Sequence, residues 1–163
     1  MANGEFRGNA DGERNVDGDL GVLAGRLLFS IQDELFRRLQ GAGFTDLVPR
    51  HGAVLAYLRL AGIRATELSR LSGQHKQVIG KNVDELEELG YVERVPDPGD
   101  RRAKLVVPTE RGRRQMRTAD SIMADIADRN RRHLGTEEFD RFLHLFRTIV
   151  RHQREAQPNG SAE

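Results

Sequence analysis

Residues 90–112, GYVERVPDPGDRRAKLVVPTERG, are the part of the sequence where the hydrophobic pattern changes most clearly. Two short runs rich in valine, 91–95 and 104–107, flank a segment of two prolines, a glycine and two aspartates. Valine-rich runs are typical of β-strands, and proline, glycine and aspartate between them are typical of turns. The sequence therefore predicts a β-hairpin whose long tip covers residues 96–100.

The residues on both sides of this hairpin follow a helical period instead. Apolar residues recur every three or four positions, and glycines separate the segments in which they do so. Pro49 is suited to the first turn of a helix, where its missing amide hydrogen costs nothing. The predicted helices cover residues 20 to 41 or 43, 49 to 61, 66 to 72, 74 to 89 and 136 to 153, and a further helix begins at 109 or 110 and has apolar positions as far as 126.

The two ends of the chain are poor in apolar residues. Residues 1–18 are rich in glycine, asparagine and aspartate, and residues 156–163 bury nothing either, so both segments are expected to be disordered. Between them, residues 19–155 are expected to form a single domain. Its predicted fold class is mainly α-helical with a small β-hairpin.

The composition excludes several classes of function. The chain has no cysteine, so disulfides and thiol chemistry are excluded, and no window approaches the roughly 18 apolar residues of a membrane span. Motifs of serine hydrolases, zinc proteases and phosphate-binding loops are absent. We therefore expect a cytoplasmic protein that is not an enzyme, with no catalytic residues, no cofactor, no metal and no membrane partner. A weaker alternative places a metal on Asp140 and His144, with His133 and His152 nearby.

The third and fourth predicted helices, joined at Gly73, have the pattern of a helix-turn-helix. The second helix of such a pair can enter the roughly 12 Å wide major groove of DNA if its outer face is polar. A solvated helix face is the plain alternative. The polar residues between the apolar positions of this helix are Gln74, His75, Lys76, Gln77, Lys81 and Asn82.

Positive charge is concentrated around the hairpin. Residues 94–114 contain seven Arg or Lys and three Asp or Glu, although the whole chain has a net charge of only +1. Arg101, Arg102 and Lys104 are expected at the tip, where Asp97 and Asp100 can orient the guanidinium groups. Next to a polar helix, such a hairpin can contact phosphates and enter a minor groove.

The run from residue 86 to residue 102, LEELGYVERVPDPGDRR, with the later Thr109 and Gly112, resembles the MarR family of multiple-antibiotic-resistance-type regulators. The resemblance covers residues 20–153. It implies a homodimer held by helices within 20–41 and 110–155, with a winged helix-turn-helix over 47–108 that binds duplex DNA.

The same resemblance implies roles for individual residues. Asp100 and Arg102 fall on the family's wing motif, and Arg101 on the position expected to enter a minor groove. The positions expected to read the major groove fall on Lys76, Gln77 and Lys81. The chain departs from the family pattern in three ways: at Gly80, where many relatives have a polar residue; at Pro108, which predicts an early end of the last strand; and in an N-terminal extension longer than the family minimum.

The resemblance also implies a cleft for a small aromatic or phenolic effector, lined by the first, second and fifth helices. Arg50 and His51 begin the second helix, where an anion could find cations and free amides. The alternative is that aromatic residues at helical spacing are ordinary core. The candidate cleft residues are Phe29, Phe36, Arg50, His51, Tyr57, Arg59 and Met116.

Together these features predict a repressor that binds a pseudo-palindromic DNA sequence as a homodimer and releases it when an effector changes the spacing of the two reading helices. Two alternatives remain within DNA binding: an activator, and a constitutive binder without an effector. A third, from another class, is a winged-helix module that binds protein.

Overall fold

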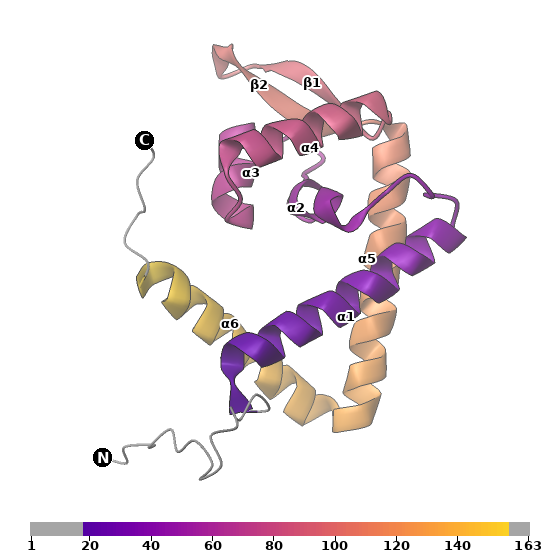
Figure 1. Ribbon diagram of the computed structural model, residues 1–163, viewed down its shortest axis with the longest axis vertical. Coiled ribbons are helices and arrows are strands. Elements are labelled where there is room, and N and C mark those ends of the chain that lie inside the picture. The colour runs from indigo at the N-terminus through magenta and orange to yellow at the C-terminus, as the bar shows by residue number, and fades with distance from the viewer. Residues whose placement is uncertain (1–17, 157–163) are drawn as a thin grey trace, which may run out of the picture. The chain divides into compact units, whose positions relative to one another are not determined.

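The computed structural model describes residues 18–156. Apart from Gly18 and Ala156, the segments predicted to be disordered lie outside these residues. The described chain forms two compact units, one ending at Ala119 and one beginning at Asp120. In chain order the elements are α1 (Leu20–Gly41), η2 (Pro49–His51), α2 (Gly52–Leu55), α3 (Ala65–Ser72), α4 (Lys76–Glu88), β1 (Val92–Asp97), β2 (Asp100–Pro108), α5 (Glu110–Leu134) and α6 (Thr136–Ala156) (Figure 1).

The mainly α-helical fold with a small β-hairpin is confirmed. In the first unit, α3 and α4 lie beside the antiparallel pair of β1 and β2 (Figure 1). The core of this unit draws on every element from the end of α1 to β2. Its fully buried apolar residues are Leu39, Leu47, Val54, Ile63, Leu68, Ile79, Val83, Leu86, Tyr91, Val92 and Val106.

The second predicted helix is shorter than expected. Only η2 and α2 are helical, and the chain leaves the helix after Leu55. Further along the chain, Ile63 pairs with Val106 through two backbone hydrogen bonds of 3.0 and 2.9 Å. The chain has to be extended at Ile63 to make this bridge. Gly62, with φ of +87°, makes the turn before it.

The hairpin is longer than expected. β1 and β2 run to Asp97 and Asp100, so the turn is only Pro98 and Gly99. Asp97 accepts the backbone N–H of Gly99 at 2.8 Å and closes this tight turn. The expectation that Pro108 ends the last strand early is wrong, because Pro108 pairs with Val92 in the final register position.

The second unit contains the later part of α5 and all of α6. Ile122, Ile126 and Phe139 are buried there, and the guanidinium of Arg131 lies 5.1 Å from the centre of the Phe139 ring. The segment 156–163 was predicted to be disordered, and this is wrong for its first residue, because α6 includes Ala156. Several large apolar side chains of this unit are exposed, namely Met123, Leu134, Phe142, Leu145, Ile149 and Val150.

Candidate nucleic-acid interface

The turn between α3 and α4 is built from side-chain hydrogen bonds and one glycine. Gly73 has φ of +70°, which a glycine adopts without strain. The hydroxyl of Ser69 donates to the carbonyl of Gln74 at 2.6 Å, and Ser72 accepts the N–H of Gln74 at 3.3 Å. These bonds set the direction in which α4 leaves the turn.

Helix α4 has one buried and one exposed face. Ile79, Val83 and Leu86 are fully buried against the core. The five residues predicted to read DNA are all exposed, together with one apolar residue that the sequence analysis passed over, Val78. The exposed residues at the start of α4 and just before it are Gln74, His75, Lys76, Gln77, Val78 and Lys81.

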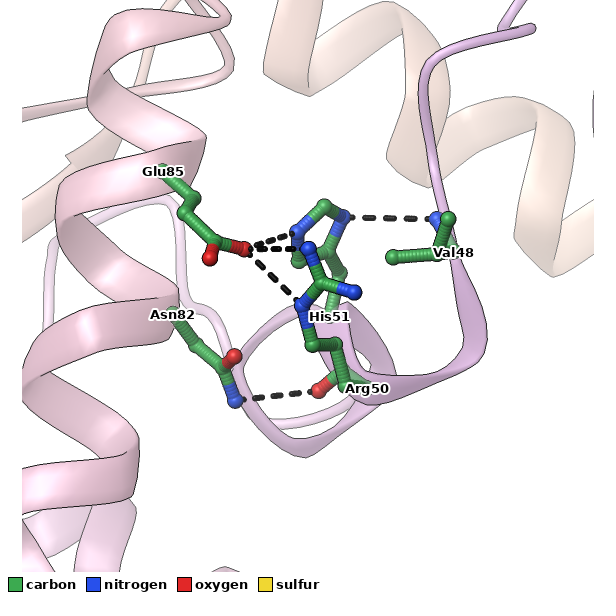
Figure 2. A network of polar contacts seen from close by, with 5 residues as sticks. All are labelled: Val48, Arg50, His51, Asn82 and Glu85. Atoms are coloured by element: carbon green, nitrogen blue, oxygen red, sulfur yellow. Dashed lines mark hydrogen bonds and ion pairs between the residues drawn. The ribbon is translucent and has the colours of Figure 1, made fainter.

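Asn82 was expected on the outer face of α4, and this is wrong. Its side chain is buried, and its Nδ2 donates to the carbonyl of Arg50 at 3.1 Å (Figure 2). A buried amide needs such a partner. Asn82 therefore holds α4 against η2 instead of facing outward.

Glu85 extends this connection between α4 and η2 (Figure 2). One oxygen of its carboxylate lies 2.9 Å from Nε of Arg50 and 3.0 Å from Nε2 of His51. The Nδ1 atom of His51 accepts the N–H of Val48 at 3.4 Å, so the ring proton is on Nε2 and is donated to Glu85. The hydrogen bonds from His51 and Arg50 hold the pKa of Glu85 below its usual value.

The two wing aspartates have a partner that the sequence analysis missed. The guanidinium of Arg64, the residue before α3, lies 2.5 to 2.6 Å from the carboxylate of Asp97 and 3.7 Å from that of Asp100. Backbone hydrogen bonding from Gly99, followed by the contact with Arg64, lowers the pKa of Asp97. The expectation that these aspartates orient the wing arginines is wrong for Arg102, because Asp100 accepts its backbone N–H at 3.1 Å. Arg64 clamps the wing to the start of α3.

The predicted cationic run is partly neutralised by carboxylates. Arg94 is ion-paired with Asp84 and Glu87 of α4, and other arginines of the run pair with Asp46 or Glu110. Within residues 18–156, no ion pair involves the exposed Arg102 or Lys104. Arg101 lies in β2, and its side chain is outside the described part. Two wing cations, Arg102 and Lys104, thus lack a carboxylate partner in the part of the chain that the structure describes.

Thr109 and Gly112 join the wing to α5. The hydroxyl of Thr109 donates to the carbonyl of Gly90 at 2.6 Å and accepts the N–H of Gly112 at 3.1 Å. A Cβ on Gly112 would lie 2.1 Å from the carbonyl oxygen of Tyr91, so no other residue fits. The Thr-x-x-Gly motif is a close backbone contact between α5 and the segment after α4.

The candidate cleft residues are only partly brought together. The ring of Phe36 is buried and lies 3.8 Å from the position of a Cβ on Gly52, next to His51. Phe29 is 71% exposed, and Arg59 is ion-paired with Glu67 of α3 at 3.0 Å. Tyr57 and Met116 are half-buried. Arg50 and His51 share Glu85, so an anion binding there would have to displace it.

Other kinds of site find little support in the described residues. No group of three or more His, Asp or Glu in this part of the chain could hold a metal ion. Asp140 of the alternative metal pair contacts Arg131 at 3.3 Å. None of the helices within residues 18–156 is long and apolar enough to cross a membrane.

Comparison with solved structures finds close matches in fold. CouR from Rhodococcus jostii RHA1 bound to p-coumaroyl-CoA is 26% identical, with a TM-score of 0.72 over 90% of this chain and 99% of that one. A MarR-family regulator from Rhodococcus sp. RHA1 is also 26% identical, with a TM-score of 0.67 over 84% and 96%. The repressor CouR bound to a 23-mer DNA duplex is 25% identical, with a TM-score of 0.65 over 83% and 94%.

Comparison of sequences is informative for the central part of the chain. No curated protein sequence matches the chain. The model of the MarR family matches residues 43–103, which run from the end of α1 through the helix-turn-helix to the wing. The family match and the structural relatives are consistent with a winged helix-turn-helix made of α3, α4 with its exposed face, and the wing beside it. Residues 43–103 are thus similar to the MarR family, and the chain shares its winged-helix fold with solved transcriptional regulators, one of them described as a MarR-family protein.

Proposed function

We propose that this protein is a repressor that binds a pseudo-palindromic DNA sequence as a homodimer and responds to a small aromatic effector. The observation that supports DNA reading is the exposed start of α4 beside a wing whose Arg102 and Lys104 have no ion pair among the described residues. Gln77 and Lys81 can donate to base edges, and Arg102 and Lys104 can contact phosphates or a minor groove. The structural relative CouR has been captured on a DNA duplex, which supports this assignment.

Val78 adds a candidate specificity contact to this face. It is 44% exposed on α4, whereas the next residue, Ile79, is fully buried. Gly80 beside it leaves open space where a side chain would be. In the major groove an aliphatic side chain recognises the methyl group of thymine. We assign Val78 to such a contact.

Two exposed apolar surfaces support the homodimer. On α1 the exposed residues are Leu20, Leu23, Leu27, Leu28 and Phe29, and on α6 they are Phe142, Leu145, Ile149 and Val150. Contiguous apolar surfaces of this kind mark protein interfaces. A second copy of the chain covers both in the proposed dimer.

The small-molecule response rests on an unsatisfied polar group. The Oε1 atom of Gln115, on α5, is buried and has no hydrogen-bond donor within the described residues. A buried acceptor of this kind calls for a donor, and a phenolic hydroxyl is one. Gln115 precedes Met116, a candidate cleft residue. The relative bound to p-coumaroyl-CoA supports an aromatic effector.

Selection of genomic fragments by the purified protein, over a range of salt concentrations, tests DNA reading. An inverted repeat is expected among the bound fragments. Replacing Arg102 by Ala should weaken binding and flatten the logarithmic salt slope by about one unit per lost phosphate contact. Arg132→Ala, in the last turn of α5, is the matched control and should leave both unchanged. Binding without sequence preference would favour the protein-interaction alternative.

A DNA fragment obtained in this selection also tests the proposed contact of Val78 with a thymine methyl group. Replacing single thymines by deoxyuridine removes only the methyl group, and at one position this should cost about 0.8 kcal/mol. Val78→Ala should bind the thymine and deoxyuridine duplexes equally at that position. If the wild-type protein does not distinguish the two duplexes anywhere, Val78 does not contact thymine.

A further inference from the structure

Arg111, in the first turn of α5, connects three parts of the first unit. Its Nη1 atom donates to the carbonyl of Leu89, the residue after α4, at 2.5 Å. Its Nη2 atom donates to Asp46, in the loop after α1, at 2.8 Å. The guanidinium also lies 4.3 Å from the centre of the Tyr91 ring, within the range of a cation–π contact.

Tyr91 closes a triangle with Asp46 and Arg111, which we call the Arg111 triangle. The hydroxyl of Tyr91 donates to one carboxylate oxygen of Asp46 at 2.6 Å, and Arg111 uses the other oxygen. Tyr91 is fully buried, and its ring lies 6.2 Å from that of Phe44. Burial, and then Asp46, raise the pKa of Tyr91, so its hydroxyl remains a donor.

The triangle adds something that Thr109 and Gly112 do not provide. Those two residues contact only the backbone of the segment after α4, whereas Arg111 also reaches the loop after α1. One planar guanidinium serves a carbonyl and a carboxylate at the same time, which the single ammonium of a lysine does less well. The end of α4 cannot shift against α1 and α5 without breaking one of these bonds.

We propose that Arg111 is a positioning residue for DNA reading, which fixes α4 relative to the loop after α1 and the start of α5. It acts through Leu89, Asp46 and Tyr91 and does not itself contact DNA. This inference rests on the proposed DNA-binding function. A misplaced α4 loses base contacts, while phosphate contacts from the wing persist.

The test compares Arg111→Met with the wild-type protein on the selected fragment and on a random duplex. Affinity for the selected fragment should fall about two- to thirty-fold, the range found for residues that couple sites without touching the ligand. Affinity for the random duplex and the salt slope should stay unchanged. Arg113→Met is the matched control, because it removes the same charge from the same helix turn. Among the described residues the guanidinium of Arg113 is ion-paired with Glu110 at 3.7 Å, and its loss should keep the wild-type ratio of the two affinities.

Two further variants test the inference if Arg111→Met fails to fold. Tyr91→Phe keeps the ring under the guanidinium and removes one bond of the triangle, and it should lower the same affinity ratio by a smaller factor. Asp46→Asn combined with Arg111→Met should lose less than the sum of the two single losses. The inference is overturned if all these ratios equal that of the wild type, or if the salt slope of Arg111→Met falls by about one unit, which indicates a phosphate contact. If the wild-type protein itself shows no sequence preference, the proposed function fails instead.

Discussion

The two units of the chain differ in how completely they bury their apolar side chains and pair their charged ones. In the unit ending at Ala119, the winged helix buries most of its large apolar residues, with Leu60 and Val78 as exceptions, and pairs most of its charges. In the unit beginning at Asp120, α6 buries Phe139 but leaves Phe142, Ile149 and Val150 exposed. The winged helix of the first unit has the features of a self-sufficient domain, whereas α6, like the exposed face of α1, has those of half an interface. The following changes test this difference.

The largest effect on the free energy of unfolding is expected at Gly112, where two backbone segments lie in close contact. Gly112→Ala places a Cβ 2.1 Å from a carbonyl oxygen and should lower the free energy of unfolding by about 3 kcal/mol or more. Gly80→Ala is the matched change in a helix with open space, and it should raise the free energy of unfolding by about 0.5–1 kcal/mol. Urea denaturation measures both. Equal effects of the two changes would contradict the close contact between α5 and the segment after α4.

A charge on α6 should separate the copies without unfolding the winged helix. Phe142→Glu is expected to yield monomers and to weaken DNA binding by about 100-fold, because each half-site is then bound independently. Light scattering and DNA titration measure the two effects. Thr148→Glu adds the same charge at another exposed position on α6 and should remain dimeric. A dimeric Phe142→Glu would place the interface elsewhere.

A smaller effect concerns the buried amide of the first unit. Gln115→Met keeps the side-chain volume and removes the unsatisfied oxygen, so the free energy of unfolding should rise by about 1 kcal/mol. The variant should also lose the response of DNA binding to phenolic compounds. Thermal unfolding and DNA titration with added phenolic acids check the two expectations separately. Unchanged release by the same compounds would remove Gln115 from the effector site.

The smallest effect is an acid dependence that comes from Asp46. Burial alone would raise the pKa of Asp46, but hydrogen bonds from Tyr91 and Arg111 outweigh it and hold the pKa below 3.8. A carboxylate with a lowered pKa stabilises the fold above pH 3.8, and this contribution is lost as the pH falls further. Asp46→Asn should therefore lose less stability than the wild type between neutral pH and pH 3 or below. Urea midpoints at several pH values measure the difference, and parallel curves would contradict it.

The sequence was sufficient for features that depend on local pattern. The period of apolar residues predicted the extent of α1, and the valine-rich runs around Pro98 and Gly99 predicted the hairpin. Contacts between distant residues were not predictable in this way. The bridge between Ile63 and Val106 joins residues more than 40 positions apart in the chain.

The residues of the candidate site also fall into two groups, those that a local pattern predicted and those whose place depends on distant contacts. The exposed residues at the start of α4 were predicted correctly as exposed, because the buried positions between them follow a helical period. Asn82 was misplaced, since its partner is the carbonyl of Arg50, 32 residues away. Arg64 was missed because its partner Asp97 is 33 residues away, and no local pattern links the two. A polar residue at a helical core position, such as Asn82, is nevertheless a signal that sequence reasoning can use.

The clamp formed by Arg64 has a consequence for the DNA that this protein selects. A wing held to the start of α3 keeps a nearly constant offset from α4, so the duplex has to present its neighbouring grooves at that spacing. Deforming DNA costs free energy that depends on its sequence, and A-tracts have a narrow minor groove already. The preferred binding sequence should therefore include A·T-rich steps beside the bases that α4 reads, at positions where no side chain reads a base.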